Sequence, residues 1–193
     1  MTDRTSSSQR TFLQGTAAAV AVAAVPGAAQ ATDHWDTVET PTENTIHDVA
    51  YTSDGAFAVA GGGIVLERTD NGWETVIDGG PTGNGNDLYG AGVTGAGGSL
   101  WFVGASGAIG EFDFRDRVVE DYSAPNDVTN NFNDVAVVGP AGDASVYVAG
   151  DSGKIYYSFD DGDTFDEVTP GSGSAVHAVD FHDSRSGHAV DGN

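Results

Sequence analysis

The amino-acid sequence predicts an all-β fold built from repeats of four short strands. Three observations support this prediction. Segments rich in Val, Tyr, Phe and Trp, many of them alternating apolar with polar residues, recur from residue 35 onward, and this pattern is typical of strands. The connecting segments are rich in Gly, Asn, Asp and Pro, which favour turns. No segment after Ala31 has a sustained helical period.

The strand-like segments recur in a fixed order. Near the start of the repeats, Asp48, Asp87 and Asp134 lie 39 and 47 residues apart. Repeats of roughly 40 to 50 residues with four strands each indicate the blades of a β-propeller. The sequence predicts four-stranded antiparallel blades at 46–77, 86–122 and 132–168, a half blade at 175–193, and a strand at 35–39 that belongs to the closing blade.

These repeats, within residues 32–193, amount to about three and a half blades. We expect an incomplete ring, because a closed propeller has at least about four blades. One interpretation is that the sequence is the N-terminal portion of a longer propeller or a truncated gene product. The other is that copies associate through open blade edges, since unpaired strand edges invite association, or that the chain forms a strained four-bladed ring that lacks a strand.

The first 31 residues have the plan of a secretory signal peptide. Arg4 and Arg10 precede an apolar run from Ala17 to Val25, and small residues before position 32 provide a cleavage site after Ala31. The segment SQRTFLQ resembles a twin-arginine export signal, although Gln9 stands where that signal has its first arginine. We therefore expect export to the cell surface or medium, with no membrane insertion after cleavage.

Charge excludes several classes of function. The chain has 29 acidic and 7 basic residues and a formal charge of −22, which disfavours nucleic acid and anionic membranes as partners. The composition resembles that of exported haloarchaeal proteins, which stay soluble in high salt where screening suppresses self-repulsion. The absence of cysteine excludes disulfides and zinc–thiolate sites.

The acidic stretch from Ser158 to Val168 is the most specific motif. It allows three interpretations: a structural turn between a third and a fourth strand, a calcium loop, or a catalytic carboxylate pair. Its glycine falls among the acids, whereas a calcium loop alternates its acids before the glycine. The turn interpretation assigns the motif to five residues: Ser158, Asp160, Gly162, Thr164 and Phe165.

These five residues match the S-x-D-x-G-x-T-W hairpin, or Asp-box, of BNR-type propellers, with Phe in place of Trp. A shortened copy keeps Asp70, Gly72 and Trp73. The unit at 148–168 resembles repeats of the photosystem II assembly-factor type of BNR-like propeller. That resemblance implies a propeller that binds proteins. We expect no cofactor, no metal ligand and no catalytic residue.

The expected function is therefore that of an exported, non-enzymatic scaffold for an unknown protein partner. The longest polar loops, 78–86 and 123–131, are expected to carry the contacts. The alternative is a fragment of an extracellular carbohydrate-active propeller, sialidase-like or of another glycoside hydrolase type. Arginines that converge on one face would favour that enzyme, and arginines that point outward from hairpin turns would count against it.

Overall fold

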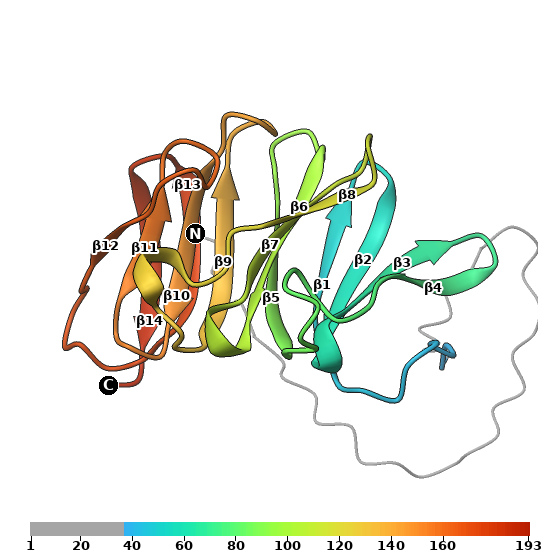
Figure 1. Cartoon of the computed structure of the whole chain (residues 1–193). Helices are drawn as coiled ribbons and strands as arrows, with labels where there is room; N and C mark the ends of the chain where they lie inside the picture. The colour runs from blue at the N-terminus through green and yellow to red at the C-terminus, as the bar shows by residue number, and fades with distance from the viewer. Residues whose placement is uncertain (1–36) are drawn as a thin grey trace, which may run out of the picture. The chain divides into compact units, whose positions relative to one another are not determined.

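The structure, a computed structural model, describes residues 37–193, so the predicted signal peptide at 1–31 lies outside the described residues (Figure 1). Residues 37–193 form four antiparallel sheets that follow one another along the chain. The helical elements of this part are three single turns of 3-10 helix: η1 (Gly61–Gly63), η2 (Ala105–Gly107) and η3 (Pro125–Asp127). Within residues 37–193, no helix has the length and hydropathy to span a membrane.

Three sheets have four strands, each paired with the strand before it in sequence. The first contains β1 (Ile46–Thr52), β2 (Gly55–Ala60), β3 (Ile64–Thr69) and β4 (Gly72–Ile77). The second contains β5 (Leu88–Val93), β6 (Ser99–Gly104), β7 (Ile109–Asp113) and β8 (Val118–Asp121). The third contains β9 (Phe132–Val138), β10 (Ser145–Gly150), β11 (Ile155–Ser158) and β12 (Asp166–Val168).

The fourth sheet has two strands, β13 (Val176–Asp183) and β14 (Ser186–Asp191). Of the strand predicted at 35–39, residues 35 and 36 lie outside the described part. Thr37 to Glu39 are exposed and form no strand. A strand needs a neighbour for its backbone hydrogen bonds. Among the described residues the fourth sheet consists of β13 and β14 alone, so it offers no fourth-strand position at which the segment from Thr37 to Glu39 could pair.

The register of each sheet reveals the true repeat. Pairing between the first and second strands shifts after the same position in every sheet, namely after Ile46, Leu88, Phe132 and Val176. These positions lie 42, 44 and 44 residues apart. Asp48 therefore corresponds to Gly90, not to Asp87 as the sequence spacing predicted. An aspartate just before a strand and one inside it look alike in sequence, and only the pairing distinguishes them.

The core lies between successive sheets. In β6, Leu100 and Phe102 pack toward the first sheet, while Trp101 and Val103 pack toward the third. Successive residues of a strand point to opposite faces, so a strand covered on both faces becomes apolar throughout. This explains why all six residues of β6 are buried, and the same holds for β10.

Candidate functional site

The predicted motif folds into a turn held by its own side chains. Ser158, which is buried, donates a hydrogen bond from Oγ to Asp160 Oδ1 (2.7 Å) and accepts one from the backbone N–H of Gly162 (2.9 Å). Asp160 also accepts hydrogen bonds from the N–H and the hydroxyl of Thr164, at 3.0 and 2.6 Å. The Thr164 hydroxyl and then Ser158 lower the pKa of the Asp160 carboxyl. The Asp160 carboxylate therefore accepts hydrogen bonds from other residues of the same turn.

Gly162 and Phe165 join this turn to the second sheet. Gly162 has φ of 92°, as its predicted role requires, because residues with a Cβ rarely adopt that conformation. A Cβ there would lie 2.6 Å from Cη2 of Trp101 and 3.0 Å from the ring of Tyr122. The Phe165 ring packs against the core between the second and third sheets. The structure therefore brings the five predicted residues together as a turn that is also a blade-to-blade contact.

Asp161, between two residues of the motif, has a role that the motif did not predict. Its carboxylate accepts hydrogen bonds from the backbone N–H groups of Gly142 (2.9 Å) and Ala144 (3.1 Å). These two residues belong to the turn between β9 and β10. Asp161 therefore ties the outer hairpin of the third sheet to the neighbouring turn of the same sheet. The motif alone could not predict this contact, because Gly142 and Ala144 lie outside it.

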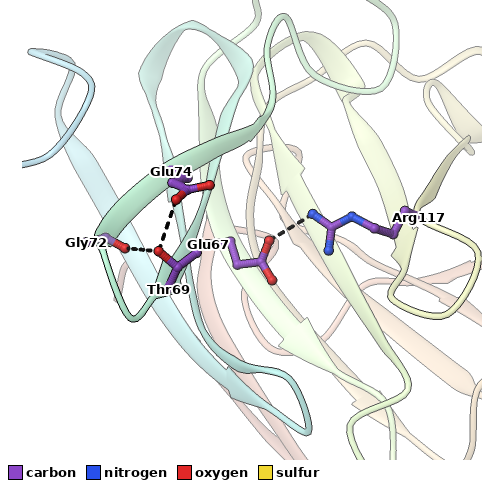
Figure 2. A network of polar contacts seen from close by, with 5 residues as sticks. All are labelled: Glu67, Thr69, Gly72, Glu74 and Arg117. Carbon is purple, nitrogen blue, oxygen red and sulfur yellow. Dashed lines mark hydrogen bonds and ion pairs between the residues drawn. The ribbon is translucent and has the colours of Figure 1, made fainter.

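The predicted shortened copy is held differently. Thr69 Oγ1 donates to the carbonyl of Gly72 (3.0 Å) and contacts Oε1 of Glu74 (3.1 Å), as Figure 2 shows. Among the described residues, the Asp70 carboxylate makes no hydrogen bond and the residue is exposed. Trp73 is half-buried, with the guanidinium of Arg68 5.9 Å from its ring centre. The structure does not gather Asp70, Gly72 and Trp73 into the arrangement seen at 158–165.

Aspartates at the equivalent positions of two sheets link each sheet to the next. Asp48 Oδ2 accepts a hydrogen bond from the N–H of Ala91 (3.0 Å), and Asp134 Oδ2 accepts one from Val179 (2.9 Å). Burial raises the pKa of the Asp134 carboxyl, against the opposing effect of its two backbone donors. The second sheet has Gly90 here, and a Cβ at that position would lie 2.8 Å from Cα of Asp134. The second and third sheets thus approach too closely for a side chain.

A cavity of about 580 Å³ lies beside β7 and β8, and most of its charged lining residues are acidic. Glu111, at 8% exposure, accepts a hydrogen bond of 2.5 Å from Ser99 Oγ. Burial raises the pKa of the Glu111 carboxyl, and the nearby carboxylate of Asp161 raises it further. Arg115 contributes the basic group of the lining. Within residues 37–193, no group of three or more His, Asp or Glu side chains is arranged to hold a metal ion.

A second hollow, of about 270 Å³, lies on the face of the third sheet that meets the fourth. We call it the aromatic groove, and its lining consists of Tyr147, Ile155, Tyr157, Phe159, Val168, Phe181, Ser184 and Arg185. Tyr147 stacks on Phe181, with ring centres 3.6 Å apart. The Arg185 guanidinium lies 5.0 Å from the ring centre of Phe159. The groove combines an apolar floor with one exposed cation.

The arginines of residues 37–193 do not converge on one face. Arg68 lies over Trp73 in the first sheet, and Arg117 pairs with Glu67 across the first and second sheets (2.8 Å; Figure 2). Arg115 lines the acidic cavity. Arg185 lies in the aromatic groove. Such dispersal does not form the arginine cluster that binds a substrate carboxylate.

The loops expected to carry contacts are used between neighbouring sheets. In the loop at 123–131, Asn126 Nδ2 donates to the carbonyl of Phe165 (3.0 Å). In the loop at 78–86, Pro81 lies so close to β7 of the second sheet that a Cβ on Gly110 would lie 2.9 Å from its Cβ. Both loops therefore contact the neighbouring sheet.

No protein-family model matches the chain, and no curated protein sequence matches it either. Among solved structures, it is similar to U3-55K, with TM-score 0.61 and 13% identity over 75% of this chain and 45% of that one. It is similar to the WD40 repeats of RRP9, with TM-score 0.60 and 12% identity over 75% and 44%. It is also similar to YCF48 bound to D1 peptide, with TM-score 0.59 and 22% identity over 77% and 48%.

The prediction of an all-β propeller with four-stranded antiparallel blades is confirmed by the sheets and by these likenesses. The four sheets are thus propeller blades, three complete and one with two strands. The chain spans slightly less than half the length of the structures that it matches, in keeping with an incomplete ring. At these identities the likeness establishes the fold alone.

Proposed function

We propose that this chain is an exported, salt-adapted β-propeller segment that binds another protein as an assembly scaffold and catalyses no reaction. The observation that carries the proposal is the aromatic groove between the third sheet and the end of β13 with its following turn. Phe159 and Val168 in this groove are 45% and 49% exposed. A hollow lined by aromatic side chains, with exposed apolar residues at its rim, is typical of protein-binding surfaces.

Further features support this function. The structure of YCF48 bound to D1 peptide is one case in which a propeller of similar fold holds a peptide. The turn at 158–165 has the residues of an Asp-box, and we assign it that structural role because its polar groups bond to one another. The formal charge of −22 favours solubility in concentrated salt, and the plan of residues 1–31 favours export.

A site-specific photocrosslinker tests the binding function. We would place it at Phe159 in the groove and, as a matched control, at Tyr51, which is 81% exposed on the first blade. Each protein is irradiated in the secreted fraction of its source. We expect a discrete adduct from position 159 and none from position 51. No adduct at 159, or the same adduct at both positions, would contradict the proposal.

Export has its own test. The N-terminus of the secreted protein is expected at Thr32, after cleavage behind Ala31. A secreted protein that begins at Met1, or a chain retained in the cell, would contradict the predicted signal peptide.

The alternative function, carbohydrate hydrolysis, is favoured by one observation. Glu111 is a buried carboxyl of raised pKa in an acidic cavity, as a general acid would be. We consider this role secondary because Ser99 hydrogen-bonds the carboxylate and the arginines are dispersed. An enzyme would hydrolyse chromogenic glycosides, and Glu111→Gln would abolish that activity. We expect no hydrolysis by either protein.

A further inference from the structure

The acidic cavity beside β7 and β8 lies between the second and third blades, each of which has all four strands. The second blade contributes its outer hairpin to the lining, and the third contributes residues of two turns, at 141–142 and at 161. Arg115 is the single basic side chain of the lining, against five acidic ones. The acidic side chains are those of Glu111, Asp113, Asp116, Glu120 and Asp161. The lining therefore carries an excess of negative charge.

Glu111 is the most buried of these acids, with 8% of its surface exposed. Its Oε1 accepts the hydrogen bond from Ser99 Oγ, whereas its Oε2 accepts no hydrogen bond within residues 37–193. A buried carboxylate ordinarily has hydrogen-bond donors or an opposite charge beside it, because leaving it unpaired costs free energy. Glu111 thus presents an acceptor without a donor at the wall of a cavity large enough to admit one.

Three further carboxylates of the lining keep an oxygen without a donor in the described part of the chain. Asp113 accepts the N–H of Asp116 through Oδ1 alone (2.8 Å), and Glu120 accepts the hydroxyl of Tyr122 through Oε2 alone (2.7 Å). The Asp116 carboxylate accepts no hydrogen bond there. Asp161 differs, because backbone N–H groups occupy both of its oxygens. Together with Glu111, four carboxylates are therefore available to a ligand.

The electrostatics of Glu111 favour a positively charged ligand. Burial raises the pKa of its carboxyl, the carboxylates of Asp161, Glu120 and Asp113 raise it further, and the hydrogen bond from Ser99 opposes them. A cation beside Oε2 would offset both the burial and the repulsion. Because salt screens a buried pair less than an exposed one, such a contact would persist in concentrated salt.

The geometry favours an extended organic cation over a single metal ion. Within residues 37–193, no three His, Asp or Glu side chains are placed to share one ion. The volume of about 580 Å³ is instead that of a small-molecule site. An alkyl chain with amino groups along it can reach separate carboxylates, and its methylene groups can pack on Val118, which also lines the cavity.

We propose that the acidic cavity binds an organic cation with two or more amino groups on one flexible chain. Glu111 Oε2 accepts a hydrogen bond from one ammonium group, and Asp113, Asp116 or Glu120 accepts one from another. Free polyamines have this chemistry, and so do neighbouring lysine side chains of a peptide. The site is separate from the aromatic groove, so the inference goes beyond the proposed scaffold function.

Spermidine is the first probe, titrated into the whole protein by isothermal titration calorimetry at pH 7 in concentrated potassium chloride. High salt suppresses diffuse attraction of a polycation to a chain of charge −22, so binding that remains requires a built site. We expect saturable binding of a single molecule. A blocked Lys-Ala-Lys peptide is the second probe. Tighter binding of spermidine assigns the site to free polyamines, and tighter binding of the peptide assigns it to lysine side chains.

Variants locate the binding. We expect Glu111→Gln to weaken spermidine binding by about tenfold and Asp116→Asn by about threefold. Asp70→Asn is the matched control, because it removes the same charge from an exposed position of the first blade, and it should change the affinity by less than about twofold. Arg115→Gln should strengthen binding, because a like charge leaves the lining, whereas Arg68→Gln should not. Circular dichroism confirms that each variant is folded.

Two results would overturn the proposal. One is the absence of saturable binding of either probe in concentrated salt. The other is binding that Asp70→Asn weakens as much as Glu111→Gln does, which would indicate diffuse attraction to the acidic surface. The scaffold function is tested at Phe159 in the aromatic groove, so loss of that adduct and loss of spermidine binding are separate results.

Discussion

The contact between Gly162 and Trp101 makes Gly162→Ala the most informative single substitution. At φ of 92°, the backbone strain of a residue with a Cβ lowers the free energy of unfolding by about 1–2 kcal/mol. The new methyl group would also lie 2.6 Å from Cη2 of Trp101, and such overpacking costs about 1–3 kcal/mol. The expected loss in free energy of unfolding is therefore about 2–5 kcal/mol.

Thermal unfolding measured by circular dichroism at constant high salt tests this value. For a domain of this size, each kcal/mol lowers Tm by about 2–4 °C, so we expect a decrease on the order of 10 °C. The matched control is Gly83→Ala, because Gly83 has φ of 71° and no atom within 4 Å of an added Cβ. Only backbone strain applies there, at about 1–2 kcal/mol. Equal decreases for the two variants would refute the packing argument.

Three further predictions concern charged groups. Asp134→Ala removes the acceptor of two backbone N–H donors, one of them that of Val179. We expect urea unfolding to show a decrease of about 2–4 kcal/mol in the free energy of unfolding. A decrease below about 1 kcal/mol would contradict the proposed link between blades. Burial raises the pKa of Glu111, so its contribution to stability is present at low pH and is lost as pH rises through that pKa. Glu111→Gln should therefore be stabilised relative to the wild type at pH 7 but not at pH 4, and the opposite trend in Tm would contradict this sign. Arg117→Gln breaks a half-exposed ion pair and should cost less than about 1 kcal/mol, and still less in high salt; a larger loss would indicate a more important blade contact.

Much of the fold could be predicted from local patterns. Apolar segments such as Ser99–Gly104, bounded by turn residues, predicted strands, and their recurrence predicted blades. The motif at 158–165 could be predicted because its contacts lie within four residues along the chain. Its shortened copy at 70–73 could not, since sequence similarity does not show that Thr69 replaces the aspartate as the residue holding the turn.

The sequence alone determined the properties that depend on composition and on neighbouring residues: an acidic chain, strands of period two, and a turn bonded to itself. The tertiary structure decided what depends on residues more than 40 positions apart. It aligned Asp48 with Gly90 through strand pairing and linked Asp134 to Val179. It also placed Phe181 on Tyr147 and left Tyr157 beside the aromatic groove. Register and burial at these positions are set by packing between blades, which the identity of a single residue and its neighbours in sequence does not show.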